Sequence, residues 1–212
     1  MIPFSSHRGL MATLDRANVD TDQIIPKQFL KSIQRTGFGE SLFFDWRYRP
    51  DGKPNPEFSL NFPKFKGASI LVARNNFGCG SSREHAVWAI QQYGIRVVIA
   101  PSVNRNSAKV PAFADIFRNN CAKNSLLTIE LSEAEVNEIF LMVDRFPGLE
   151  ATVDLHEQRV VLHLPEEISF HFEIDSAVKA RLIHALDDIG ITLKYEKAIS
   201  AFELKHNPQL YR

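Results

Sequence analysis

The chain has 212 residues and an apolar share of 44%, which is enough for a buried core and argues against disorder. Its 25 basic and 25 acidic side chains balance, so nothing in the charge favours nucleic acid or an anionic membrane as a partner. No apolar run reaches the roughly 18–20 residues that cross a bilayer, the N-terminus shows no secretory signal, and the two cysteines make no disulfide framework; a cytoplasmic protein is expected.

The N-terminal part predicts short elements separated by polar turns. Residues 10–14 form a candidate first strand, and residues 15–18 form the turn after it. Asp20 and Asp22 could each cap the helix that follows or support an active site, and both interpretations stay open. The aromatic, turn-rich segment 37–63 predicts an irregular loop that packs on the body of the protein or on a partner.

The middle of the chain predicts a parallel crossover unit. Residues 68–73 are a continuous apolar run, as in a strand covered on both faces. A loop at 76–82 leads to a helix at 83–93, which Gly94 closes, and residues 96–100 form a second buried strand. Two parallel strands need such a crossover connection.

The C-terminal half predicts further helices and an antiparallel hairpin. These elements are a helix from Pro111 that carries Phe113, Ile116 and Phe117, a strand at 126–131, a helix opened by the capping box Ser132–Glu135, a hairpin at 151–155 and 160–164, a strand at 170–174, and a helix at 178–189 that ends at Gly190. We expect an α/β fold with a mixed sheet. Residues 1–190 would form one domain, and residues 191–212 a C-terminal extension.

The loop at residues 75–85 carries the strongest chemical signal. Its glycines allow a sharp turn and a close approach to a ligand. Ser81, Ser82 and Arg83 then stand at a predicted helix N-terminus, where unpaired N–H groups and the helix dipole favour an anion. Arg83 can bind a carboxylate through two parallel hydrogen bonds. From the residues alone, a small-anion site and a merely capped helix start both remain open.

Neighbouring residues in the loop have simpler interpretations. Arg83 occupies the place where a dinucleotide fingerprint needs its third glycine. Cys79 is interpreted as a small loop residue rather than a metal ligand, and His85 as a structural or partner-facing residue. Glu84 is expected to complement the positive end of the helix dipole.

Several motifs resemble one known family. Residues 80–86, Gly-Ser-Ser-Arg-Glu-His-Ala, are similar to the signature of the swivelling domain of aconitases. Residues 18–26, 37–39, 43–48 and 113–117 resemble, in the same order, the small subunits of 3-isopropylmalate dehydratases. The resemblance implies a three-layer β/β/α swivelling domain and a hydro-lyase activity.

The resemblance also implies roles for individual residues. Ser81 would be the base that removes and returns a proton, while Ser82 and Arg83 would bind a substrate carboxylate. Arg16, four positions before Asp20, would be a further substrate-binding arginine. A serine can act as a base only where several donors stabilise its alkoxide, and the helix start with Arg83 could supply them.

A cofactor and a partner follow from the same resemblance. A [4Fe–4S] cluster with one open iron needs three thiolates, and the chain has only Cys79 and Cys121. We therefore expect no metal and no cofactor on this chain. The implied partner is a large subunit that holds the cluster, and the implied substrate is a small dicarboxylate.

Three functions remain open at this point. The chain could serve the interconversion of 2- and 3-isopropylmalate in leucine synthesis, a related hydratase acting on homoaconitate, citraconate or dimethylmalate, or a catalytically silent partner of the large subunit. Residues 103–112 are an insertion relative to the family, rich in Asn, Ser and basic groups. They predict a flexible surface loop, either simply solvated or able to reach the substrate or the large subunit.

Overall fold

The computed structural model describes residues 2–31, 35–81, 83–105 and 108–206. Within these residues, one mixed sheet has the strand order β4-β3-β2-β1-β6-β7-β8, and β5 also pairs with β3. The strands are β1 Ser6–Leu14, β2 Ile70–Ala73, β3 Val97–Arg105, β4 Ala108–Val110, β5 Leu127–Ser132, β6 Glu150–Asp154, β7 Arg159–Leu162 and β8 Ile168–His171. The predicted α/β class with a mixed sheet is confirmed.

Strand β1 joins the two parts of the sheet. Its residues 11–14 pair in parallel with β2, and β2, β3 and β5 continue the parallel part. Residues 6–10 pair antiparallel with β6, which opens the β6-β7-β8 meander. Every residue of β2 is buried, whereas burial alternates along β6, because a parallel strand is covered on both faces and a meander strand has one face in water.

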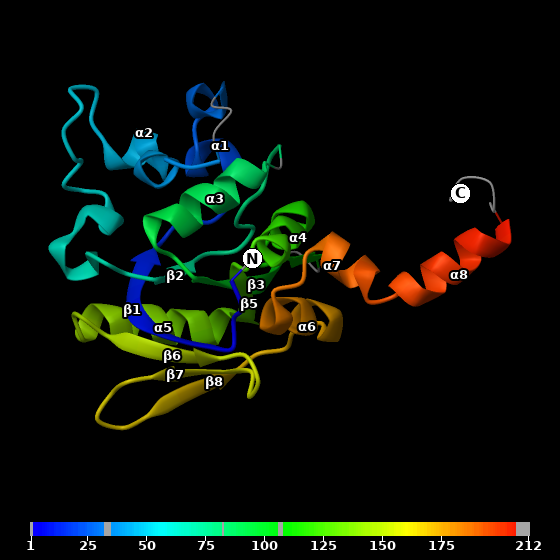
Figure 1. Ribbon diagram of the computed structural model, residues 1–212. Helices are drawn as coiled ribbons and strands as arrows, with labels where there is room; N and C mark the ends of the chain where they lie inside the picture. The colour runs from blue at the N-terminus through cyan, green and yellow to red at the C-terminus, as the bar shows by residue number, and fades with distance from the viewer. Residues whose placement is uncertain (1, 32–34, 82, 106–107, 207–212) are drawn as a thin grey trace.

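Three helices cover the parallel strands. They are α3 Glu84–Tyr93, α4 Asp115–Lys123 and α5 Glu133–Arg145. Figure 1 shows α3 and α4 on the opposite side of β2 and β3 from α5. The predicted ends of α3 and α5 are confirmed: Gly94 closes α3 with a φ of 115°, and Ser132 and Glu135 form both hydrogen bonds of the capping box that opens α5.

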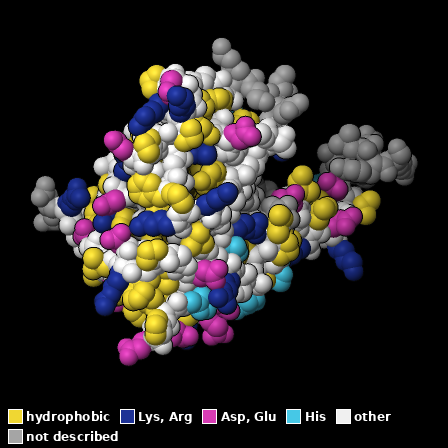
Figure 2. All heavy atoms as spheres, turned by 90° about the vertical axis from the view of Figure 1, so that its left-hand side faces the viewer, with side chains coloured by type: hydrophobic (Ala, Val, Ile, Leu, Met, Phe, Trp, Pro, Cys, Tyr) yellow, Lys and Arg dark blue, Asp and Glu magenta, His cyan; other side chains and the backbone are white. Residues whose placement is uncertain are grey.

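The N-terminal region contains short helical turns packed on aromatic side chains. They are α1 Thr21–Ile24 and α2 Phe44–Arg47, with 3-10 turns at Lys27–Lys31, Gly39–Ser41, Ser59–Asn61 and Pro63–Phe65. The predicted loop at 37–63 is thus built from turns around rings such as Phe43 and Trp46, whose centroids lie 5.6 Å apart in a stacked arrangement. On the face shown in Figure 2, acidic and basic side chains are interspersed.

The insertion at residues 103–112 lies largely at the surface, as predicted, but residues 103–105 and 108–110 form strands instead of a loop; residues 106–107 lie outside the described residues. β3 continues to Arg105 and pairs antiparallel with β4, with Val103 opposite Val110. Val103 is buried, and Nζ of Lys109 lies 2.8 Å from Oε1 of Glu130. A buried valine and an ion pair to the next strand anchor the hairpin, which is why the polar composition misled the prediction.

The helix predicted from Pro111 also begins later, at Asp115. Residues 111–113 are extended instead, because Phe113 forms a parallel bridge with Phe77 and the carbonyls of Pro111 and Ala112 accept hydrogen bonds from a neighbouring loop. Of the residues predicted on this helix, Phe117 is buried and Ile116 is 61% exposed.

The last predicted helix is divided into two. α6 Ser176–His184 ends at Ala185, which has a φ of 51°. Gly190, predicted to end the helix, lies within the next helix, α7 Asp188–Leu193. Asp187 caps α7 and accepts a hydrogen bond from the N–H of Gly190. α8 Glu196–His206 then projects away from the body (Figure 1); the division into residues 1–190 and 191–212 remains a proposal.

No helix among the described ranges is long and apolar enough to span a membrane.

Candidate functional site

The loop between β2 and α3 lies between two extended segments that are distant in sequence. On one side it hydrogen-bonds to residues 18–21, and on the other side to residues 111–114. The bonds are Asn18 N to Asn75 O (2.9 Å), Gly78 N to Val19 O (2.8 Å), Thr21 N to Cys79 O (2.9 Å), Asn76 N to Pro111 O (2.8 Å), Phe77 N to Ala112 O (2.9 Å) and Ala114 N to Phe77 O (3.1 Å). Main-chain bonds on both sides thus hold the serine-bearing loop in place.

Both glycines of the loop are required by its geometry. Gly78 and Gly80 have φ values of +77° and +86°, a region that disfavours any side chain. A Cβ on Gly80 would overlap the carboxylate of Asp20, and a Cβ on Gly78 would overlap the ring of Phe117. The group that approaches Gly80 is the protein's own Asp20, and the close approach to a ligand stays a prediction.

Asp20 is the N-cap of α1. Its Oδ1 accepts a hydrogen bond of 2.6 Å from the N–H of Asp22, and the side-chain oxygen of Gln23 accepts one of 3.0 Å from the N–H of Asp20. This capping box fixes the carboxylate beside Gly80. Of the two interpretations left open for Asp20, the structure therefore shows capping.

Ser81 is fixed through its main chain. The hydroxyl of Thr21, a fully buried residue, donates a hydrogen bond of 2.8 Å to the Ser81 carbonyl, whereas Ser81 itself is exposed. A rigid backbone with an exposed side chain is the arrangement that a reacting hydroxyl needs. Ser82, the neighbouring predicted ligand, lies outside the described residues.

Arg83 stands at the N-cap of α3 in an extended conformation, and its guanidinium forms an ion pair with Asp22. The Arg83 side chain is 20% exposed. Asp22 also forms an ion pair with Lys27, whose Nζ lies 3.3 Å from Oδ2 of Asp22. Asp22 therefore pairs with two cations and does not cap α1. Its support of an active site and the binding of a substrate carboxylate by Arg83 stay predictions.

Arg16 has a different environment. Its guanidinium carbon lies 4.4 Å from the centroid of the Trp46 ring, a cation–π contact, and its carbonyl accepts a hydrogen bond of 3.3 Å from the N–H of Arg74. The structure therefore brings Ser81 and Arg83 together on one loop. It places Arg16 at the end of β1, where the side chain covers an aromatic residue.

The remaining loop residues keep their simple interpretations. Burial, and then the negative charge of Asp20, raise the pKa of Cys79, so its thiol stays protonated and is a poor metal ligand. His85 packs edge-on against Phe38, with centroids 5.3 Å apart, and contacts Trp88 at 4.8 Å. Its structural role is thereby favoured over that of a general acid.

The described residues do not fit an iron–sulfur cluster. They contain no group of three His, Cys, Asp or Glu side chains that could hold a metal ion. Cys121 is buried, and burial raises the pKa of its thiol well above the usual value. Two protonated cysteines, one in the loop and one in α4, cannot supply the three thiolates of such a cluster.

The sequence analysis missed two partners in the site. Thr21 holds the carbonyl of Ser81, and Lys27 shares Asp22 with Arg83. The polar residues at 20–23 predicted the start of a helix. Nothing in their spacing indicated that the same turn would lie against a loop 60 residues later.

Comparisons with known proteins agree with this geometry. The profile of the aconitase C-terminal domain matches residues 1–134. The chain is 56% identical over 205 residues to the 3-isopropylmalate dehydratase small subunit of Desulforapulum autotrophicum, covering 97% of this chain and 96% of the relative. It is 53% identical to the small subunit of the same name from Brevibacillus brevis, covering 97% and 100% of the two chains.

A solved structure supports the fold. The crystal structure of 3-isopropylmalate dehydratase LeuD from Methanocaldococcus jannaschii has a TM-score of 0.60 and 24% identity to this chain, and covers 93% of this chain and 99% of its own. At that identity the likeness concerns architecture alone, and it agrees with the aconitase-type fold expected from the motifs. The chain belongs to the aconitase C-terminal domain family and, within it, to the 3-isopropylmalate dehydratase small subunits.

Proposed function

We propose that this chain is the small subunit of a two-subunit hydro-lyase that interconverts 2- and 3-isopropylmalate by dehydration and rehydration, in leucine biosynthesis. The observation that carries the proposal is the identity of 53–56% over nearly the full length of two relatives bearing that name. The biosynthetic role also supports our proposal of a cytoplasmic location.

In the proposed reaction Ser81 is the base. Its side-chain oxygen, as the alkoxide, would take the proton from the carbon adjacent to the one that carries the leaving hydroxyl and become a hydroxyl, which would return the proton during rehydration. The exposed side chain on a fixed backbone supports this assignment. The start of α3 and the guanidinium of Arg83 would stabilise the serine alkoxide, because Ser81 comes just before the positive end of the helix dipole and two residues before a guanidinium.

Arg83 would bind one carboxylate of the substrate. The ion pair with Asp22 indicates that the Arg83 guanidinium can bind a carboxylate at this position. In the proposed complex the substrate would share or replace Asp22, with Lys27 left to balance the aspartate charge. We also retain Ser82 and Arg16 as proposed substrate-binding residues; Arg16 would have to leave the ring of Trp46 to take this role.

The departing hydroxyl needs a Lewis acid, and the described residues of this chain do not fit a cluster that could act as one. We propose that a large subunit carries a [4Fe–4S] cluster, which supplies that Lewis acid. The substrate, a small dicarboxylate, would then bind between the two subunits. This chain would contribute the base and the carboxylate-binding arginine.

The proposal is tested by reconstitution. The purified chain should show neither hydratase activity nor iron–sulfur absorbance, and activity should appear when an anaerobically prepared large subunit is added. Assays with 2-isopropylmalate, homoaconitate, citraconate and dimethylmalate then rank the substrates by kcat/KM. A preference for any of the last three would refute the isopropylmalate assignment, and turnover by the chain alone would refute the two-subunit proposal.

A further inference from the structure

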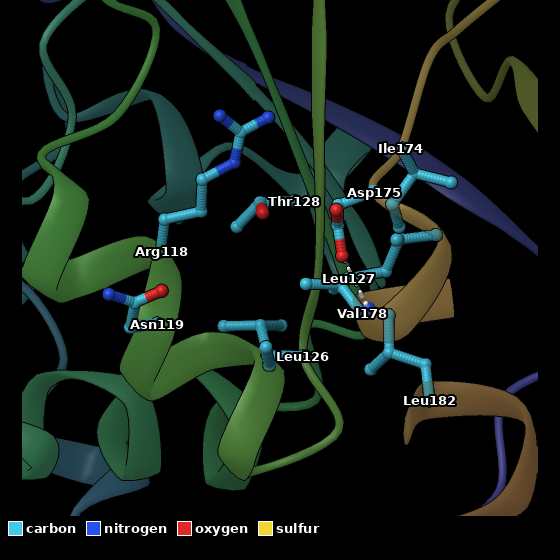
Figure 3. A pocket seen from close by; sticks show the side chains of 10 residues that line it. Arg118, Asn119, Leu126, Leu127, Thr128, Ile174, Asp175, Val178 and Leu182 are labelled. Atoms are coloured by element: carbon cyan, nitrogen blue, oxygen red, sulfur yellow. Dashed lines mark hydrogen bonds between the residues drawn. The ribbon is translucent and has the colours of Figure 1, made fainter. Parts of the chain in front are cut away.

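A second candidate ligand site lies on the far side of α4 from the serine loop. A cavity of about 440 Å³ is lined by residues of α4, β5 and α6 and by the segments next to them, as Figure 3 shows. This volume suits a small molecule. None of its lining residues belongs to the loop at 75–85, so it is separate from the proposed active site.

The inner surface of this cavity is aliphatic. Its accessible aliphatic surface comes from Val178 and Ile174, which are half-buried on the α6 side. Leu126, Leu127 and Leu182 form the closed floor behind them and are each at most 1% exposed. No aromatic ring is among the lining residues. Such a surface favours a short branched aliphatic group, because each methyl group that enters it is removed from water.

Two opposite charges line the cavity. Arg118 projects from α4 on one wall, and Asp175 stands at the start of α6 on the other (Figure 3). The Arg118 side chain is 44% exposed, and its Nη1 lies 3.8 Å from Oε2 of Glu130, a long distance for an ion pair. Since a guanidinium carries five N–H donors, this long contact leaves Arg118 able to bind another anion.

Asp175 also retains binding capacity. Its Oδ1 caps α6 by accepting hydrogen bonds from the N–H groups of Ala177 and Val178, at 2.9 and 3.0 Å. Oδ2 takes no part in these two bonds. The helix cap holds the carboxylate in a fixed orientation, so one oxygen can accept a bond from a cation in the cavity.

We propose that this cavity binds a small α-amino acid with a branched aliphatic side chain. Its carboxylate would pair with Arg118, its ammonium group with Asp175, and its side chain would cover Val178 and Ile174. A purely anionic ligand would place its charge near Asp175, and a purely cationic one near Arg118, so a zwitterion fits best. The assignment does not depend on the proposed hydro-lyase activity.

Three probes that share one aliphatic skeleton test the proposal on the full chain. L-leucine carries both charges, 4-methylpentanoate lacks the ammonium group, and 3-methylbutylamine lacks the carboxylate. Calorimetric titration should give saturable binding of L-leucine, and each of the other probes should bind at least about tenfold more weakly, because each loses one charge-assisted hydrogen bond. No saturable binding of L-leucine, or equal affinities for all three probes, would overturn the proposal.

Two variants locate the binding. Arg118→Gln and Asp175→Asn should each weaken L-leucine binding about tenfold or more, and Asn keeps the cap of α6. Their matched controls are Arg159→Gln, an exposed arginine on β7, and Asp187→Asn, the cap of α7; neither residue lines the cavity. Circular dichroism confirms that each variant is folded. Control variants that weaken binding as much as the cavity variants would contradict this location.

Discussion

The guanidinium of Arg83 forms an ion pair with the carboxylate of Asp22, a residue 61 positions earlier in the chain. Asp22 lies in α1 and Arg83 at the start of α3, so this pair connects the two segments that flank the serine loop. Asp22 also contacts Lys27 at 3.3 Å. The pair fixes the position of the Arg83 guanidinium, which we propose as a ligand of the substrate carboxylate.

Loss of Asp22 should therefore impair substrate binding. In the reconstituted enzyme, Asp22→Asn should lower kcat/KM by roughly ten- to a hundredfold, since a small misplacement of a binding group has effects of this size. Steady-state kinetics measures the change. Asp51→Asn, which removes an exposed aspartate paired with Lys53, is the control and should leave the kinetics unchanged. An unaffected Asp22→Asn enzyme would mean that Arg83 needs no orienting partner.

Arg83→Lys should raise KM and lower kcat together. An ammonium group keeps the charge but cannot reproduce the two parallel hydrogen bonds of a guanidinium. The measurement is the substrate dependence of the initial rate, with Arg159→Lys on β7 as the matched control. Parental kinetics in Arg83→Lys would leave only a charge requirement at this position.

Ser81→Ala should abolish most of the turnover and leave subunit assembly intact. The change removes one exposed hydroxyl and leaves the carbonyl that Thr21 holds. Loss of a proton-transfer group costs on the order of 10²–10⁴ in rate. Rate assays and size-exclusion chromatography with the large subunit make the test, and Ser5→Ala, at an exposed position, is the control. A rate within twofold of the parent would assign the base to another group.

Gly80→Ala should destabilise the chain more than Gly52→Ala. Both glycines have positive φ values, +86° and +79°, but an added Cβ overlaps Asp20 at Gly80 and meets nothing within 4 Å at Gly52. Each substitution has the left-handed conformation cost of about 1–2 kcal/mol, and Gly80→Ala adds an overpacking cost of ~1–3 kcal/mol. Urea denaturation measures both free energies of unfolding. Equal losses would show that Asp20 moves aside freely.

Glu130 should make folding stability depend on acidic pH. Burial alone would raise its pKa, but hydrogen bonds from Lys109 and Ser102 and nearby positive charges outweigh burial and lower the pKa below 4.5. A carboxyl group with a lowered folded pKa stabilises the fold above its unfolded pKa, and this contribution is lost as the pH falls through the folded value.

The test compares Glu130→Gln with the parent chain in urea denaturation across a pH series. The difference in free energy of unfolding should be constant above pH 4.5 and should shrink below it. Glu157→Gln, at an exposed turn position, should show no such trend. A constant difference at all pH values would mean that the pairing with Lys109 does not stabilise the hairpin.

Local elements whose causes lie within a few residues could be predicted from the amino-acid sequence. The apolar run of β2, the capping box at Ser132 and Glu135 and the closing Gly94 were all predicted, because burial on both faces, side-chain capping and a left-handed residue each leave a local pattern. The motif at 80–86 likewise indicated the chemistry of the loop and the family.

Contacts between groups that are distant in the chain could not be predicted and became visible with the fold. The Asp22–Arg83 pair, the bond from Thr21 to Ser81 and the ion pair that anchors the 103–110 hairpin all join residues 20 or more positions apart. The polar composition of that segment predicted a loop. The prediction missed that the partner of Lys109 is Glu130 on β5. Local propensity cannot register such partners, since pairing across a fold depends on where the sheet places each strand.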